Sequence, residues 1–399
     1  MLTKEDNELF SRVGPGTPAG ELLRRYWYPI AFAADLTEDS PTKLVRLLGE
    51  ELVLFRDKSD NVGLLADHCA HRGASLFYGR VEERGIACAY HGWLYDAQGH
   101  CLETPAEPAD SKFHLTVRQR AYPVQKVVGL YWAYLGPLPA PALPRYDILV
   151  RRDGRRTIQL RGQVDCNYLQ AMENSCDPAH LVVLHQDSAA RGRPIPNSTR
   201  GFTDDVESFD FYVTSYGIMK RRIYTDGRVD EHPLIFPNIL RQGNGMEIRV
   251  PLDDTHTWIY EIRFYPTDDG SLIEDEGDPP IEPQTPHKDR PGLAHPYARF
   301  SMAQVDHQDY MAWETQGQIP DRSIERLATS DRGVVLFRQV LRENIERVQQ
   351  GGDPLGVIRD PDHAMIDTNL TVSLHVEMGW FPKTQNEASN NRRSTVVEA

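Results

Sequence analysis

The order of hydrophobic and polar residues changes character along the chain. Its start has the pattern of a short helix, because Thr17 can cap it, Pro18 suits its first turn and Pro29 ends it. From about residue 43 to residue 135 the chain instead shows short alternating runs separated by Asp, Gly and Pro, which are typical of strands joined by turns. The sequence therefore predicts an N-terminal helical segment followed by a small all-β domain.

The second half of the chain predicts a mixture of strands and helices. Its apolar runs indicate strands at Phe209–Tyr224, His232–Leu240 and Trp258–Phe264. They indicate helices at Tyr168–Leu184 and Asp331–Gln349. A proline-rich connector, residues 136–144, separates this region from the β domain. The predicted fold class is α+β, with a helical segment over 1–25, the all-β domain over 26–138, a larger domain over 145–383 and a flexible tail over 384–399.

Composition and charge exclude some classes of partner. Hydrophobic residues make up 40% and charged residues 26% of the chain, as in an ordinary globular protein. The formal net charge of −14 disfavours nucleic acid, because phosphate binding needs clustered Lys and Arg. No apolar run approaches the roughly 20 residues that span a bilayer, and the first residues lack a signal-peptide pattern. We therefore expect no membrane span and a cytoplasmic location.

Two short segments each offer one cysteine and one histidine. Cys69 and His71 stand in the first, and Cys88 and His91 stand in the second. Two such arms can hold a [2Fe–2S] cluster, with both thiolates on one iron and both imidazoles on the other. A zinc site, which more often pairs Cys with Cys, is the alternative. An odd count of cysteines disfavours a disulfide framework, so the remaining three are expected to be buried thiols: Cys101, Cys166 and Cys176.

This pattern resembles the Rieske domain of ring-hydroxylating oxygenases, whose C-x-H…C-x-x-H motif is matched at Cys69, His71, Cys88 and His91. Respiratory-chain Rieske proteins carry an additional cysteine in each loop, and neither loop has one here. The resemblance implies a small all-β Rieske domain and a larger catalytic domain with an antiparallel sheet flanked by helices. It also implies two cofactors, the Rieske [2Fe–2S] cluster and a mononuclear Fe(II).

A second group of candidate ligands lies in the helix predicted near residue 168. Asp177 and His180 share one face of a continuous helix, whereas His185 lies further around it. Both imidazoles can face one metal ion only if the helix ends or bulges between them, and Pro178 is compatible with that geometry. Two histidines and one carboxylate on one side of Fe(II) leave positions open for O₂ beside a substrate.

The run from Asn167 to His185 resembles the catalytic-domain motif of the same family, which implies that His180 and His185 are iron ligands. The resemblance also implies that Asp177 links an iron-ligand histidine to the Rieske histidine of a neighbouring subunit, in a head-to-tail homotrimer. Asn174 is expected to lie next to the iron ligands without binding the iron itself, and a packing role is the alternative.

The third iron ligand is expected to be a distant carboxylate, and Asp331 is the first choice. It lies in the run 321–334, the best match to the family, and it precedes an amphipathic helix whose start is a rigid place for a ligand. The alternative role is that of an acid that caps this helix or interacts with its dipole. The carboxylates held in reserve are Asp321, Asp309 and Glu314.

The chain also resembles the phthalate-dioxygenase-like branch, which contains dioxygenases and O-demethylases of aromatic carboxylates, at residues 219–222, 232–238 and 308–314. Counting by twos from Phe209 places Arg221 on the apolar face of a strand. Counting by twos in the same way, Arg241 follows Ile239. A cation among apolar neighbours suits a carboxylate, so both arginines are candidate substrate-binding residues. A solvated arginine or a structural ion pair is the alternative.

The family implies both the reaction and its partners. The reaction is hydroxylation, dihydroxylation or O-demethylation of a small aromatic substrate with O₂, and a separate reductase supplies electrons from NAD(P)H. No glycine-rich dinucleotide motif occurs in this chain, so the reductase is expected to be another polypeptide. Two alternatives are a Rieske electron-transfer protein without oxygenase activity, which the second iron motif disfavours, and a zinc-stabilised binding module.

Overall fold

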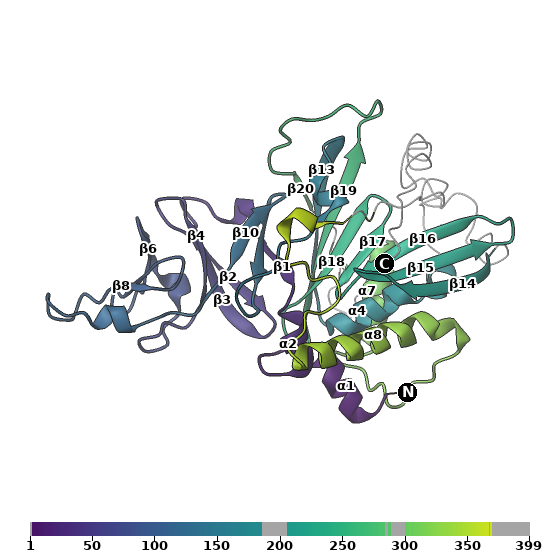
Figure 1. The fold of residues 1–399 in the computed structure, drawn as a ribbon, viewed down its shortest axis with the longest axis horizontal. Helices are drawn as coiled ribbons and strands as arrows, with labels where there is room; N and C mark the ends of the chain where they lie inside the picture. Colours follow the sequence, from purple (N-terminus) through teal and green to yellow (C-terminus); the bar gives the residue numbers. More distant parts are fainter. Residues whose placement is uncertain are drawn as a thin grey trace. The chain divides into compact units, whose positions relative to one another are not determined.

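The computed structural model describes residues 2–185, 206–283, 286–288, 300–302, 304–366 and 368. The chain forms two compact units (Figure 1), a smaller one of Val13–Pro141 and a larger one of Met1–Arg12 with Ala142–Ala399. The division falls inside the proline-rich connector, whereas the expected tail over 384–399 lies outside the described residues. None of the described helices combines the length and the apolar character that crossing a bilayer requires.

The smaller unit consists of antiparallel sheets with the strand orders β2-β3-β4-β9, β5-β6-β7-β8 and β1-β11-β10. Its elements in chain order are α2 (Pro18–Leu23), β1 (Trp27–Phe32), η1 (Ala33–Asp35), β2 (Thr42–Leu47), β3 (Glu50–Arg56), β4 (Val62–Ala66), η2 (Leu76–Tyr78), β5 (Arg80–Glu82), β6 (Gly85–Ala87), β7 (Leu94–Tyr95), β8 (Cys101–Glu103), η3 (Phe113–Thr116), β9 (Ala121–Tyr122), β10 (Val124–Val127) and β11 (Leu130–Tyr134). The predicted small all-β domain is confirmed.

Helix α2 begins as the sequence predicts and ends earlier. Pro18 is its first residue, and the Thr17 hydroxyl accepts a backbone N–H from its first turn. The helix ends at Leu23 rather than at Pro29, because the residues around Pro29 pair with β11 as strand β1. Pro29 lies beside a shift in the register of this pairing, where a missing N–H is tolerated.

The larger unit is built on an eight-stranded sheet with the order β14-β15-β16-β17-β18-β19-β13-β20. All its neighbouring strands are antiparallel except β13 and β20. Its elements are α1 (Lys4–Ser11), β12 (Arg145–Tyr146), α3 (Asp147–Val150), β13 (Gly154–Val164), α4 (Tyr168–Cys176), α5 (His180–Val183), β14 (Val206–Val213), β15 (Gly217–Tyr224), β16 (Val229–Ile235), β17 (Ile239–Gln242), β18 (Gly245–Pro251), β19 (Thr257–Pro266), β20 (Ile281–Pro283), α7 (Val305–Thr315), η6 (Thr329–Asp331), α8 (Arg332–Gln349), η7 (Pro361–His363) and β21 (Met365–Ile366). The predicted α+β class, with a mostly antiparallel sheet flanked by helices, is confirmed.

The stretch predicted as one strand over Phe209–Tyr224 is a hairpin. Strands β14 and β15 pair antiparallel, with Val213 opposite Ile218 and Asp210 opposite Arg221. Odd-numbered residues of β14 therefore share a face with even-numbered residues of β15, so counting by twos through the turn assigns the wrong face. The result matters for Arg221, which lies on the face opposite to the one that the count predicted.

The helices of the larger unit pack around α4. This helix contacts α7, α8, α1 and the strands β17 and β18, and Figure 1 shows α4 and α8 running side by side. The approach of α8 is closest at Gly333, where an added Cβ would overlap the carbonyl oxygen of Cys176 and the ring of Phe211. The absence of a side chain at this position thus lets α8 pack directly against the end of α4.

We expect Gly333→Ala to lower the free energy of unfolding by about 1–3 kcal/mol, because the new methyl group has no room between α4 and β14. At an unstrained helical position the same change would stabilise the helix by about 1 kcal/mol. Urea denaturation measures the difference. Val335→Ala, on the exposed face of the same helix, serves as the control and should change the stability by less than about 0.5 kcal/mol. A Gly333→Ala protein more stable than the parent would contradict the close packing.

Candidate metal centres

The two Cys/His segments of the smaller unit form loops with the same backbone geometry. In the first, the N–H of Gly73 donates to the carbonyl of Cys69 at 2.8 Å; in the second, the N–H of Gly92 donates to the carbonyl of Cys88, also at 2.8 Å. Both glycines have positive φ angles, 74° and 73°, which side chains rarely adopt. Each loop therefore turns back tightly on its own cysteine and presents a thiol and an imidazole together.

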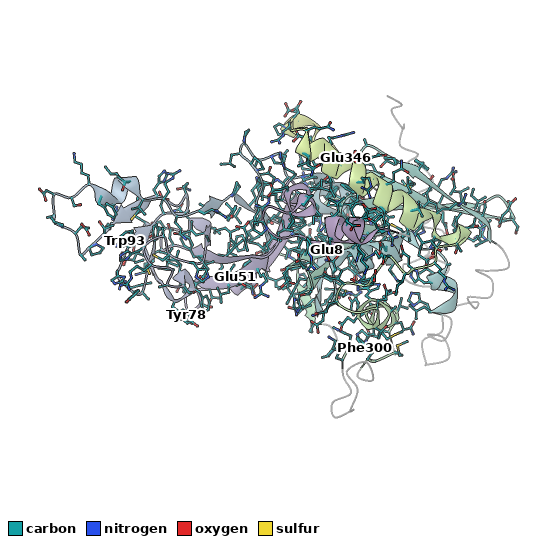
Figure 2. The ribbon with its side chains drawn as sticks, turned by 90° about the horizontal axis from the view of Figure 1, so that it is seen from below. Glu8, Glu51, Tyr78, Trp93, Phe300 and Glu346 are labelled. Atoms are coloured by element: carbon teal, nitrogen blue, oxygen red, sulfur yellow. The ribbon has the colours of Figure 1, made fainter. Side chains whose placement is uncertain are left out.

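The thiols lie inside and the imidazoles lie nearer the surface. Cys69 and Cys88 are each 3% exposed and belong to one apolar cluster. The rings of His71 and His91 have centroids 4.5 Å apart, and His71 stacks on Trp93, which Figure 2 labels, at 4.2 Å. This separation of a thiol pair from an imidazole pair matches the ligand order of a mixed Cys/His [2Fe–2S] cluster.

Two details favour a bound cluster at these loops. The Nδ1 atom of His71 is buried without a hydrogen-bond partner among the described residues, which would cost about 1–3 kcal/mol if nothing bound it. The hydroxyl of Tyr95 lies 3.3 Å from the Sγ of Cys69. Burial and the neighbouring Cys69 raise the pKa of Tyr95, so the hydroxyl keeps its proton and can donate it to a thiolate.

In the larger unit the helix breaks once before His180 and ends again at Val183, between the two histidines, as the prediction required. Helix α4 ends at Cys176, and Asp177 has an extended backbone (φ −93°, ψ 113°), as expected for a residue that precedes proline. The carboxylate of Asp177 then accepts the N–H groups of Ala179 and His180 at 2.7 and 3.2 Å. Asp177 thereby ends one helix and stabilises the first turn of the next, α5, which begins at His180.

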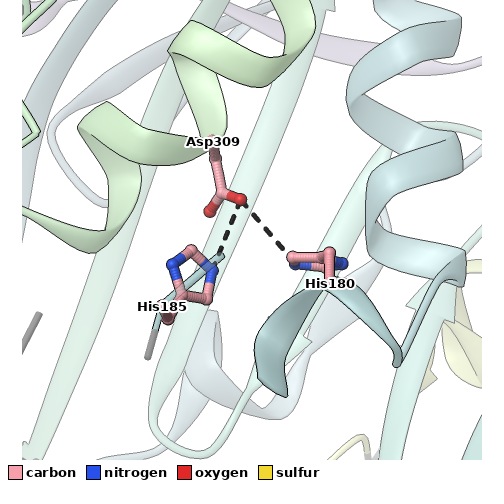
Figure 3. A group of neighbouring side chains, drawn as sticks. All are labelled: His180, His185 and Asp309. Carbon is pink, nitrogen blue, oxygen red and sulfur yellow. Dashed lines mark ion pairs between the residues drawn. The ribbon is translucent and has the colours of Figure 1, made fainter. Parts of the chain in front are cut away.

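His180, at the start of α5, and His185, just beyond its end, both face one carboxylate, that of Asp309 on α7 (Figure 3). The Oδ1 atom of Asp309 lies 3.4 Å from Nε2 of His185 and 3.7 Å from Nε2 of His180. One ligand atom from each residue lies within 4.8 Å of the other two. Two imidazoles and one carboxylate converging in this way are the ligand set of a mononuclear non-haem iron site.

The electrostatics of this cluster support an ionised carboxylate. Burial would raise the pKa of Asp309, but the two neighbouring histidines hold it below its ordinary value. Burial would lower the pKa of His185, but the nearby Asp309 carboxylate raises it above its ordinary value. The Nε2 atom of His185 is buried and lies 3.4 Å from Oδ1 of Asp309 without a hydrogen-bond partner among the described residues, so it can serve as a metal ligand.

Other side chains contact these three residues. The amide of Asn174 donates to Oδ1 of Asp309 at 3.2 Å. The Nδ1 atom of His180 lies 3.5 Å from Oδ2 of Asp177. The remaining contact, between Nδ1 of His185 and Oε1 of Gln308 at 2.8 Å, was not anticipated from the sequence. Its partner is more than 120 residues away, so local spacing carries no signal of it.

This geometry favours Asp309 over Asp331, the first choice from the sequence, as the third ligand. Its carboxylate accepts the N–H of Ala328 at 2.6 Å, just before α8, which is the structural role named as the alternative. Of the reserves, Asp321 accepts from Ser323, and Glu314 pairs with His287 and Lys288. Asp309 is the carboxylate that the fold places between His180 and His185.

The two candidate substrate-binding arginines are held in ion pairs. Arg221 lies 3.2 Å from Glu231 and 3.8 Å from Asp210. Arg241 is 1% exposed, and its guanidinium lies 3.0 Å from Asp147. Both guanidinium groups already face carboxylates of the chain itself, so the structure favours the structural alternative for both. The three remaining cysteines are buried free thiols, as predicted: Cys101, Cys166 and Cys176.

Comparisons with known proteins agree with both centres. Residues 26–123 match the model of the Rieske [2Fe-2S] domain, and residues 298–380 match a LigXa C-terminal domain like family. The chain is 38% identical over 372 residues to the 5,5'-dehydrodivanillate O-demethylase oxygenase subunit of Sphingobium sp. (strain NBRC 103272 / SYK-6), covering 90% of this chain and 84% of that one.

A second relative, the phenoxybenzoate dioxygenase subunit alpha of Ectopseudomonas oleovorans, is 38% identical over 380 residues and covers 87% of this chain and 86% of its own. Among solved structures, the NdmA QL mutant of Pseudomonas putida CBB5 with theobromine superposes with a TM-score of 0.60. It has 20% sequence identity and covers 84% of this chain and 93% of its own, which is evidence for the shared fold alone.

We expect Asp309→Ala to remove the mononuclear metal and Asp331→Ala to retain it. The first change deletes a ligand, whereas the second loses one exposed hydrogen bond worth at most about 1 kcal/mol. Iron analysis of anaerobically purified protein, with the cluster quantified by its visible absorption, measures the difference. The reverse pattern, with iron lost only from Asp331→Ala, would restore Asp331 as the ligand.

Proposed function

Because this chain belongs to the Rieske non-haem iron oxygenases, as an oxygenase alpha subunit, we propose that His180, His185 and Asp309 are the ligands of its mononuclear iron. The ligands proposed for its [2Fe–2S] cluster are Cys69, His71, Cys88 and His91. The observation that carries the proposal is the convergence of two imidazole nitrogens and one carboxylate oxygen within 4.8 Å.

The family membership defines the reaction class. The protein is the oxygenase component of a multicomponent system that hydroxylates or O-demethylates an aromatic substrate, and a separate reductase supplies its electrons. The relatives that match over most of their length are oxygenase subunits, so an electron carrier without oxygenase activity has no support.

The chain's own residues prepare the mononuclear site. When bound there, iron supplies the binding and reductive activation of O₂ beside the substrate. Three ligands on one side leave the other positions accessible. The Asp177 carboxylate, 3.5 Å from Nδ1 of His180, favours a proton on that nitrogen and leaves Nε2 of His180 to the metal. Asn174, by donating to Asp309, limits the rotation of the carboxylate.

A head-to-tail homotrimer is part of the proposal. Within the smaller unit, exposed aromatic side chains surround the histidine ligands: Tyr90, 57% exposed, contacts the ring of His91, and Phe113, 45% exposed, contacts Trp93. Exposed apolar groups around a redox centre are typical of a surface that another protein covers. In the larger unit, Asp177 is partly exposed beside His180. We infer that these two surfaces meet between neighbouring subunits.

The substrate is proposed to be a carboxylated aromatic, as the names of the dehydrodivanillate and phenoxybenzoate relatives suggest. The test uses the holoenzyme with a ring-hydroxylating reductase, NADH and a panel of methoxylated, phenoxylated and unsubstituted aromatic acids. Substrate-dependent O₂ uptake with formaldehyde release would identify O-demethylation, and formation of a diol would identify dihydroxylation. Turnover of only uncharged aromatics would overturn the substrate class.

We expect His180→Ala to abolish product formation while the cluster remains reducible. The histidine ligates the mononuclear iron alone, so the loss should exceed about 100-fold, in line with the loss of a metal ligand rather than of a supporting contact. Product analysis by mass spectrometry and cluster reduction followed at visible wavelengths are measured on the same sample. Retained turnover in His180→Ala would contradict the proposed site.

We expect Asp177→Asn to retain both metal centres but to slow electron transfer between them about 10–100-fold, because one acceptor oxygen is replaced by an NH₂ donor, which cannot accept a hydrogen bond from an imidazole. Stopped-flow reoxidation of the reduced cluster, with substrate and O₂ present, measures the rate.

Mixed oligomers separate transfer within a subunit from transfer between subunits. Subunits carrying His91→Ala and subunits carrying His180→Ala, each inactive alone, should regain activity when co-expressed if electrons cross between neighbours. Co-expressed oligomers that stay inactive, although both chains are present, would contradict the trimer proposal.

A further inference from the structure

Gln308 connects the iron-ligand helix to the second histidine. Its Oε1 atom lies 2.8 Å from Nδ1 of His185, and its Nε2 atom donates to the carbonyl oxygen of Met302 at 2.9 Å. Gln308 is 1% exposed and His185 is 4% exposed, so water does not compete for these contacts. The amide is therefore held at both ends within the protein.

The direction of each hydrogen bond follows from the groups that make it. A backbone carbonyl can only accept, so the side of the Gln308 amide that faces Met302 is the NH₂ group. The side that faces His185 is then the amide oxygen, which can also only accept. Nδ1 of His185 must therefore carry a hydrogen. In a neutral imidazole this leaves the lone pair on Nε2, the atom 3.4 Å from Asp309.

We propose that Gln308 is a positioning residue for the mononuclear metal site: it fixes the tautomer and the ring orientation of His185, so that Nε2 is directed at the metal beside Asp309. This inference rests on the proposed function of the His180, His185 and Asp309 cluster. Gln308 does not touch the metal and acts only through His185.

The position of Gln308 in the chain gives the arrangement its rigidity. Gln308 and Asp309 are consecutive residues near the start of α7, so one turn of helix supplies both a metal ligand and the anchor of another ligand. Asp309 and the acceptor for Nδ1 of His185 are therefore held by the same stretch of backbone, which limits changes in the separation of Asp309 and His185.

The two histidines also have partners of different charge. Nδ1 of His180 faces the Asp177 carboxylate, whereas Nδ1 of His185 faces a neutral amide. A carboxylate partner makes an imidazole a more basic ligand than an amide partner does. The neutral amide orients His185 without adding another negative charge to a buried site that already contains Asp309.

The test measures metal affinity rather than turnover. The mononuclear site of the holoprotein is emptied with a chelator while the [2Fe–2S] cluster is retained, and Co(II) is titrated in as a probe. Gln308→Met keeps the size of the side chain but removes the acceptor, so we expect Co(II) to bind about 10–100-fold more weakly. Gln308→Glu keeps an acceptor for Nδ1–H, so we expect its affinity to stay within about threefold of the parent or to rise.

The pair of variants separates orientation from packing. If Gln308 served only to attach α7 to Met302, Gln308→Glu would weaken binding as much as Gln308→Met, because a carboxylate cannot donate to that carbonyl. That result, or unchanged affinity in Gln308→Met, would overturn the proposal. The matched control is Gln316→Met, at the exposed residue that follows the last turn of α7, which should bind Co(II) as the parent does.

Failure of the proposed function gives a different result. If the parent protein bound no Co(II), or if His180→Ala left its affinity unchanged, the cluster itself would not be the metal site. Retention of the Rieske visible spectrum and of the thermal midpoint in each variant shows that a loss of affinity is not a loss of folding.

Discussion

The place of His180 depends on the break in the helix at Asp177, and that of His185 depends on the end of α5. Proline at 178 disfavours helical geometry at the residue before it, so α4 stops at Cys176 and the chain restarts as α5 at His180. Helix α5 then ends at Val183, between the two histidines, which in one continuous helix would point in different directions. The same carboxylate that ends α4 holds the first turn of α5 and lies beside the Nδ1 of His180. Asp177 thus connects the backbone geometry before His180 to the proposed route for electrons.

The rest of the larger unit fixes the place of this break. Gly333 lets α8 reach the carbonyl of Cys176, and the ammonium group of Lys220, on β15, donates to the carbonyl of Ser175 at 2.9 Å. A cation suits the negative end of a helix, although burial lowers the pKa of Lys220 to about 8. Arg338 and Arg322 bind Glu173 one turn earlier. Contacts from α8, from β15 and from Arg322 therefore hold the end of α4. None of these residues is a proposed metal ligand.

The sequence predicted the features that local spacing determines and missed those that packing determines. The Cys/His loops and the helix break each depend on a few neighbouring residues, so their motifs were readable. The carboxylate at 309 is supplied by a distant helix, and no local pattern distinguished it from Asp331, which begins a more amphipathic helix. Arg221 was assigned to the wrong face because a turn inside the run changed the parity of the strand. The partner of Arg241, Asp147, lies 94 residues away and could not be found by periodicity.

The central claim is that one iron ion lies between His180, His185 and Asp309, apart from the two irons of the cluster. The most direct test is a crystal structure of the anaerobically purified protein with anomalous diffraction recorded at the iron absorption edge. We expect one anomalous peak bounded by Cys69, His71, Cys88 and His91, and a separate peak within ligand distance of His180, His185 and Asp309. A second peak ligated by Asp331, or no anomalous density between the two histidines, would contradict the account.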